Sequence, residues 1–218
     1  MIRWMYTVKN VFFVVLFFLL TGCETSTVEE QKDTIDSGTI YISVDESFKP
    51  VIDSEIQVFE ALHPKAKIIP TYKPEAECIK DFAVDSVRMV IITRRYTQQE
   101  ENFMTDSFKL APKSLELAKD AVAVIVNPSS QDTLLDMGQI YQILTGKFSK
   151  NLIPIFDGTR ATSTVRFIID SVLRGDTLTP KTMAAKSSEG VIDYVSKNPD
   201  AVGFIGVSWI GNHDDTAQ

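Results

Sequence analysis

The chain has 218 residues, 44% of them hydrophobic and 23% charged, a composition typical of a globular protein long enough for one large domain or two lobes. Its formal net charge of −7 argues against a nucleic-acid partner, because such binding needs clustered Lys and Arg. Two Cys and two His are too few for a zinc site of several Cys and His ligands or for a disulfide-stapled scaffold.

The first residues have the pattern of an export signal. Arg3 and Lys9 give a positive start, and residues 11–20 (VFFVVLFFLL) form an unbroken apolar run. This run is about half as long as a spanning helix requires, so it predicts a signal peptide over residues 1–22 rather than a membrane-spanning helix. Residues 20–23 (LTGC) resemble the lipobox of bacterial lipoproteins, which implies cleavage before Cys23 and lipidation of its thiol. The alternative is an ordinary cleaved signal.

A polar stretch follows the lipobox. Residues 24–37 lack aromatic side chains, so residues 23–37 are expected to form a flexible, lipid-anchored tether. Lipidation of Cys23 would leave Cys78 as a lone thiol, which we expect to be a small buried hydrophobic residue rather than a reactive group.

Strand and helix patterns alternate through the first half of the remaining chain. Strands are predicted at residues 39–44, 67–72 and 87–92, and Pro70 indicates an edge position or a bend for the second of them. Helices are predicted where apolar residues recur at helical spacing over residues 52–62, from residue 79, and over residues 98–105.

The second half continues the alternation. Strands are predicted at residues 121–126, 151–156 and 201–205, and helices before Gly146, over residues 165–173 and over residues 188–198. This order is typical of α/β proteins with largely parallel sheets. The polar end, residues 211–218, is expected to be a frayed tail or to mark a chain shorter than the natural protein.

The sequence matches two enzyme motifs only in part. Phe148 follows Gly146-Lys147 where a phosphate-binding loop needs Ser or Thr, and residues 206–210 (GVSWI) lack the second Gly of a nucleophile elbow. His63 and His213 have no evident Ser or Cys partner, and the carboxylates are scattered. We therefore expect a protein that is not an enzyme, with no catalytic residues, no cofactor and no metal.

Three loops share one design, in which a predicted strand ends and hydroxyl-bearing or basic residues follow near a helix start. They are residues 45–48 (DESF), 93–95 (TRR) and 157–164 (DGTRATST). Helix starts offer free N–H groups, hydroxyls add neutral donors, and Arg adds a forked charged donor. Ligands of open α/β sheets bind beyond the carboxyl ends of the strands, so the loops predict a small-anion site. Each loop taken alone is also explained by an N-cap or a solvated Arg.

Three segments carry a family resemblance. Residues 120–128 (DAVAVIVNP), 139–147 (QIYQILTGK) and 201–206 (AVGFIG) resemble the PstS-like substrate-binding proteins of phosphate ABC transporters. The resemblance implies a type 2 periplasmic binding protein: a two-lobed α/β Venus-flytrap fold with mainly parallel sheets that closes a hinge on an oxyanion. Family members continue beyond this point, which implies a first lobe incomplete at the C-terminus.

The same resemblance implies a domain organisation. Lobe I would comprise residues 38–118 plus 200–218, and lobe II residues 119–199. The strands of the hinge would lie near residues 117–120 and 199–202.

The binding loops match the family unevenly. Ser47 and Phe48 match the hydroxyl residue and the aromatic of its first loop, whereas residues 73–77 (KPEAE) do not match its Gly/Ser-rich second loop. Thr93 and Arg94 stand where its third loop usually reads Ser-Asp.

In the fourth loop, Asp157 stands where the family has an Arg, and residues 161–163 (ATS) replace Ser-Gly-Thr. The family's acidic and basic partners are thus exchanged, and we hypothesise that Arg94 donates to the anion while Asp157 orients Arg94 or accepts a ligand proton. Such an acceptor would favour protonated phosphate over sulfate. The predicted ligand-binding residues are Ser47, Phe48, Thr93, Arg94, Asp157, Arg160, Thr162, Ser163 and Thr164.

The sequence therefore predicts a lipid-anchored binding protein of the cell envelope, on its periplasmic or outer face. Its expected partners are inorganic phosphate or a similar oxyanion, an ABC permease, and the membrane through the N-terminal lipid, with no nucleic acid. Two alternatives stay open: a different anion, such as sulfate, molybdate or a small organic acid, and a surface interaction or sensor lipoprotein on the same fold.

Overall fold

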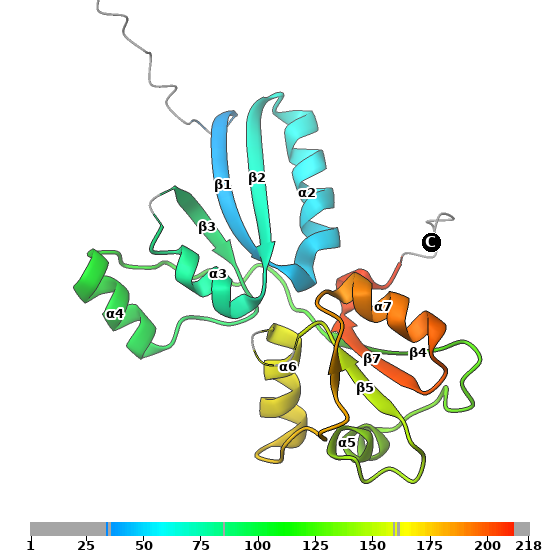
Figure 1. Ribbon diagram of the computed structural model, residues 1–218. Coiled ribbons are helices and arrows are strands. Elements are labelled where there is room, and N and C mark those ends of the chain that lie inside the picture. The colour runs from blue at the N-terminus through cyan, green and yellow to red at the C-terminus, as the bar shows by residue number, and fades with distance from the viewer. Residues whose placement is uncertain (1–33, 35, 85, 159, 161, 212–218) are drawn as a thin grey trace, which may run out of the picture. The chain divides into compact units, whose positions relative to one another are not determined.

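The computed structural model describes residues 34, 36–84, 86–158, 160 and 162–211 (Figure 1). The predicted signal peptide, Cys23 and most of the predicted tether lie outside the described residues. Within these described ranges, no helix combines the length and the apolar character needed to cross a bilayer.

The first sheet consists of three parallel strands in the order β2-β1-β3 (Figure 1). Its central strand is β1 (Ser37–Asp45), flanked by β2 (Lys65–Lys73) and β3 (Val87–Ile91). Pro70 lies on an edge strand, as predicted, where a missing N–H is tolerated.

Three helices belong to this part of the chain. The helix α2 (Lys49–Leu62) packs against β2, and α3 (Glu75–Asp81) packs against β1 and β3. The helix α4 (Gln98–Phe108) begins with a capping box formed by Thr97 and Glu100. Since α3 begins at Glu75, earlier than the predicted residue 79, the loop at residues 73–77 enters the first turn of a helix.

The second sheet has the order β4-β7-β5-β6. Of its strands β4 (Val122–Val126), β7 (Ala201–Gly206), β5 (Ile153–Phe156) and β6 (Met183–Ala184), β4 alone runs antiparallel to its neighbour. The sheets are therefore mainly parallel, as predicted. The structure adds β6, which is too short to give a periodic sequence signal.

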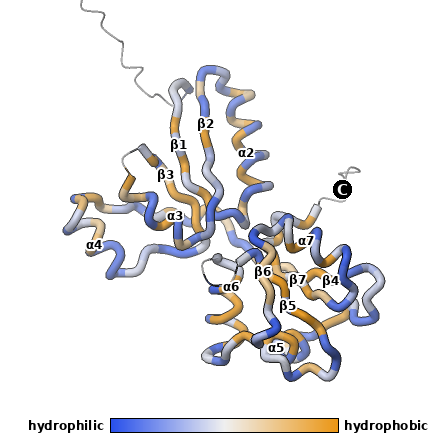
Figure 2. Tube along the Cα trace, in the orientation of Figure 1, coloured by the Kyte–Doolittle hydropathy of each residue, from blue (hydrophilic) through white to orange (hydrophobic). Residues whose placement is uncertain are grey.

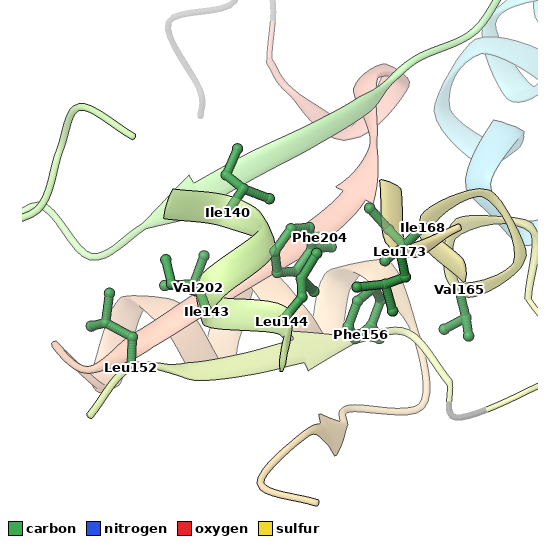
Figure 3. Packing of buried hydrophobic residues seen from close by; sticks show 10 residues of the cluster. All are labelled: Ile140, Ile143, Leu144, Leu152, Phe156, Val165, Ile168, Leu173, Val202 and Phe204. Carbon is green, nitrogen blue, oxygen red and sulfur yellow. The ribbon is translucent and has the colours of Figure 1, made fainter. Parts of the chain in front are cut away.

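Helices cover both faces of the second sheet: α5 (Met137–Thr145), α6 (Ser163–Phe167) with its π-helical continuation η2 (Ile168–Leu173), and α7 (Ser188–Lys197). Val202 and Phe204 of β7 join the cluster formed with α5, α6 and η2, shown in Figure 3. Ala201 and Ile205 join the cluster formed with α7. A strand covered on both faces is apolar at every position, which explains the hydrophobic colour along β5 and β7 in Figure 2.

One predicted boundary is wrong. Residues 200–218 were expected in lobe I and residues 199–202 in the hinge, but β7 pairs with β4 and β5 inside the second sheet. The uninterrupted apolar run of β7 is buried at all six positions, as a central strand requires. The chain leaves this sheet only after Gly206, where the Val207 amide donates to the Ala121 carbonyl at 2.9 Å.

Beyond that point, the short helix η3 (Val207–Trp209) contacts α2 and the helix η1 (Glu46–Phe48). The chain therefore passes between the elements of the two sheets twice, once near residue 121, just before β4, and once at residues 206–208, at the end of β7.

Candidate functional site

Two hydroxyl groups meet beyond the carboxyl ends of β1, in the first sheet, and β5, in the second. Ser47 lies in η1 after β1, and Ser163 begins α6 after the loop that follows β5. Their Oγ atoms are 3.4 Å apart, and both residues are buried, with exposed fractions of 1% and 4%. Two predicted binding residues that are far apart in sequence thus lie in contact.

Asp45, the last residue of β1, holds Ser47 in place. Its Oδ1 accepts hydrogen bonds from the amide and the hydroxyl of Ser47, each at 3.1 Å. Its Oδ2 is buried and has no hydrogen-bond partner among the described groups. Burial raises the pKa of Asp45 to about 6; the nearby Ser163 hydroxyl, which makes no hydrogen bond to Oδ2, and the Ser47 amide act against this rise. The free oxygen is therefore available to accept a proton donor of a ligand.

Asp157 gathers the hydroxyls of the loop after β5. It accepts hydrogen bonds from Thr162 at 2.8 Å and Thr164 at 3.5 Å, and Thr162 also caps α6 by accepting from the Val165 amide. Burial raises the pKa of Asp157 to about 6; the Thr162 hydroxyl opposes this rise, and the charges of the neighbouring carboxylates add to it.

Glu46, in η1, is one of those neighbouring carboxylates, and it binds Ser188, the first residue of α7. Its carboxylate accepts from the Ser188 amide at 3.1 Å and from the Ser188 hydroxyl at 2.8 Å. Burial raises the pKa of Glu46, and the two hydrogen bonds from Ser188 act against that rise. Within the described part of the chain, no group of three or more His, Cys, Asp and Glu residues is arranged to hold a metal ion.

A guanidinium reaches Thr93, but it belongs to Arg166 rather than to Arg94. Arg166 donates from Nε to Glu75 at 2.7 Å and from Nη2 to the Thr93 hydroxyl at 2.6 Å. Glu75 also accepts from the Thr93 amide at 3.1 Å and from the Thr93 hydroxyl. Burial alone would raise the pKa of Glu75, but the hydrogen bonds from Arg166 and Thr93 hold it below its usual value.

Of the two roles hypothesised for Asp157, orienting Arg94 is wrong, whereas accepting a ligand proton stays a prediction. Arg94 donates two hydrogen bonds to Glu100, at 2.8 and 2.7 Å, and these bonds lower the pKa of Glu100 to about 2. Glu100 is six residues away along the chain and is already fixed in the capping box of α4, so it is the nearer and better-placed partner.

The remaining predicted binding residues, Phe48 and Arg160, differ in their exposure to solvent. Phe48 is the half-buried N-cap residue of α2, and Arg160 is exposed. Cys78, expected to be a buried hydrophobic residue, is fully buried, and burial raises the pKa of its thiol to about 11.

Three residues of this arrangement were absent from the predicted set: Asp45, Glu75 and Arg166. For Arg166 a sequence signal existed, because it follows the predicted residue Thr162 by four positions and so lies on the same face of the helix. Glu75 lies in residues 73–77, which do not match the second loop of the resembled family, so the resemblance does not indicate a role for it.

Comparison with known proteins gives a superfamily and a fold. A family model described as a PBP superfamily domain matches residues 29–218. A solved structure from Clostridium perfringens, assigned as a phosphate ABC transporter substrate-binding protein with bound phosphate, has a TM-score of 0.68 at 20% identity, covering 80% of this chain and 72% of that chain. Among curated protein sequences, none matches significantly.

Two further solved structures are similar. An ABC-type phosphate transport receptor from Vibrio cholerae has a TM-score of 0.54 at 18% identity, covering 79% of this chain and 73% of that chain. A cysteine-to-serine mutant of the OxyR2 regulatory domain from Vibrio vulnificus has a TM-score of 0.57 at 8% identity, covering 81% and 75%. Identities this low show the fold alone.

Proposed function

Since the chain belongs to the PBP superfamily, we propose that it is an extracytoplasmic binding protein that captures phosphate for uptake through an ABC permease. Two structural neighbours are described as phosphate-transport proteins, and one of them holds bound phosphate. The observation that carries the proposal is the contact between the Ser47 and Ser163 hydroxyls beside the unpartnered carboxylate oxygen of Asp45. The proposed activity is binding and release, without chemistry on the ligand.

The carboxylates determine which phosphate species fits. The hydroxyls of Ser47 and Ser163 can donate to phosphate oxygens, while Asp45 or Asp157 can accept a hydrogen bond from a protonated phosphate oxygen. A buried carboxylate repels an anion that has no proton to share, as sulfate has none near neutral pH. We therefore propose preference for protonated phosphate over sulfate, with Asp45 as the first acceptor because its Oδ2 has no other partner.

Calorimetric titration with inorganic phosphate tests this function. The full-length protein should bind phosphate, and Ser163→Ala should weaken binding at least about tenfold, because a hydrogen bond to a charged ligand is lost. Ser54→Ala is the matched control, since the Ser54 hydroxyl donates to the Pro50 carbonyl on the exposed side of α2. Absence of phosphate binding in the folded wild-type protein would contradict the proposal and favour the surface interaction or sensor alternative.

We propose hinge motion at the two crossings between the sheets. The Val207 amide and the Ala121 carbonyl form a hydrogen bond there, and residues 206–208 link β7 to η3. Small changes in backbone dihedral angles at such crossings can move one group of elements relative to another.

We also propose that the chain is exported and lipid-anchored through Cys23, after removal of residues 1–22, with residues 23–37 as the tether. In an export-competent bacterium, a Cys23→Ser variant should move from the membrane fraction to the soluble fraction of the envelope. Cys78→Ser is the control, because the Cys78 thiol is buried. Recovery of the Cys23→Ser protein in membranes would refute the anchor.

A further inference from the structure

Glu75 is surrounded by the donors that an oxyanion needs. Its carboxylate is 3% exposed and accepts from the Thr93 amide, the Thr93 hydroxyl and two nitrogens of Arg166, Nε at 2.7 Å and Nη2 at 3.3 Å. A backbone amide, a hydroxyl and a forked guanidinium are the groups that bind phosphate and carboxylate in proteins. Here they hold a carboxylate that belongs to the chain itself.

The occupied guanidinium is part of the candidate site. Arg166 follows Ser163 by three residues in α6, so the two side chains are neighbours on one side of the helix. The Ser163 hydroxyl in turn contacts Ser47. Because Glu75 neutralises Arg166, an anion at the Ser47 and Ser163 hydroxyls gains little attraction from that positive charge.

We propose that Glu75 is an internal anion that competes with the external ligand for Arg166 and Thr93, and so sets the affinity of the site. The inference rests on the proposed function, since it concerns an oxyanion at the same hydroxyls. The Arg166–Glu75 bond also joins α6, which covers the second sheet, to α3, which packs on the first. Displacement of Glu75 by a ligand would therefore release a link between elements of the two sheets.

Competition of this kind also selects the class of ligand. A monocarboxylate offers two oxygens, as Glu75 does, and it competes against a group held at high effective concentration within the same chain. A tetrahedral oxyanion offers further oxygens, which can reach the Ser47 and Ser163 hydroxyls at the same time. The internal carboxylate therefore favours tetrahedral oxyanions and disfavours small organic acids.

Removing the charge of Glu75 tests the inference directly. Glu75→Gln keeps the shape and one carbonyl acceptor for Thr93, but it frees Arg166, so calorimetric titration with inorganic phosphate should show affinity raised at least about tenfold. Binding of acetate should become measurable in the same variant. In a Glu75→Gln/Arg166→Gln double variant, the gain should disappear.

Asp170→Asn provides the matched control. The Asp170 carboxylate lies 3.8 Å from Nη1 of Arg166 on the exposed side of the helix. Asp170→Asn therefore removes a negative charge close to Arg166, while Glu75 keeps its hydrogen bonds from Arg166 and Thr93. Phosphate affinity of this variant should stay within about twofold of wild type. An equal gain in Asp170→Asn and Glu75→Gln would show a general charge effect and would overturn the inference.

The remaining outcomes separate this inference from the proposed function. If wild type binds phosphate and Glu75→Gln binds it equally or more weakly, Glu75 only positions Arg166 and the inference fails while the function stands. If wild type is silent and Glu75→Gln binds, competition is supported and phosphate capture by the native chain fails. If neither folded protein binds, both fail.

Should Glu75→Gln not fold, Glu75→Asp provides a second test. This change withdraws the carboxylate by one methylene, so Glu75→Asp should also bind phosphate more tightly than wild type. An unchanged or weaker affinity overturns the inference.

Discussion

At the scale of single residues, Ser47 is held in position by residues at and just after the end of β7. The carbonyl of Ser47 accepts a hydrogen bond from the Ser208 hydroxyl at 2.5 Å. A Cβ added at Gly206 would lie 3.0 Å from the Ser47 carbonyl oxygen and 3.1 Å from the Ser47 Cβ. The backbone of Gly206, with φ −61° and ψ 141°, suits any residue, so glycine is needed here for space and not for conformation.

Gly206→Ala should therefore displace Ser47 while leaving the fold intact. We expect phosphate affinity to fall about tenfold and the free energy of unfolding to fall by about 1–2 kcal/mol, because the added methyl overpacks a close backbone contact. Calorimetric titration and urea denaturation measure the two effects. Gly138→Ala in α5, where the Cβ would lie 3.2 Å from the Asp136 side chain, should leave the affinity unchanged. Wild-type affinity in Gly206→Ala would mean that the position of Ser47 does not matter for binding.

At the scale of elements, local patterns predicted much of the fold. Gly146 ends α5 in the left-handed region, at φ 73°, as its place after the apolar face indicated. The order of strands was less accessible: β7 comes last in the chain but lies between β4 and β5, a placement that depends on pairing between distant segments. The same limit explains why residues 201–206 are predicted in lobe I, whereas the structure pairs them within the second sheet.

The candidate site, like the fold, could be predicted from the sequence only in part. The hydroxyls of Ser47 and Ser163 were predictable because they follow strand ends, and parallel strands bring such ends to one edge of a sheet. Arg94 does not pair with Asp157, because it pairs with Glu100, a carboxylate only six residues away. The pairing of Arg166 with Glu75 joins residues 91 positions apart through long side chains, and no spacing rule reports such a contact.

At the scale of the whole molecule, the fold alone does not decide the function. The OxyR2 regulatory domain is similar over 81% of this chain, with a TM-score of 0.57, and the phosphate-bound protein is similar over 80%, with a TM-score of 0.68. Function is therefore argued from the site and not from the fold. The distinctive property of this site is its set of buried carboxylates, and they also affect the stability of the entire chain.

The pH dependence of stability follows from those carboxylates. Burial raises the pKa of Asp45 and of Asp157 to about 6, from a value near 3.8 in the unfolded chain. Between these values the folded state binds more protons than the unfolded state, so stability is highest below about pH 4 for these two groups and is lost as the pH rises through 6. Glu75 and Glu100 have lowered pKa values and act in the opposite direction, but only as the pH falls below about 4.5.

The free energy of unfolding should therefore be about 2 kcal/mol higher at pH 5 than at pH 7, measured by urea denaturation without ligand. Asp45→Asn should remove at least half of this difference, because the amide carries no titrating proton and the Asp45 charge no longer adds to the rise in the pKa of Asp157. Asp193→Asn is the control, since Asp193 lies on the exposed side of α7 and pairs with Lys197. A wild-type protein that is less stable at pH 5 than at pH 7 would show that the two carboxyl groups are not desolvated in the folded state. The protonated phosphate proposed as ligand would then lose its acceptor, because a solvated Asp45 would already have its Oδ2 satisfied by water.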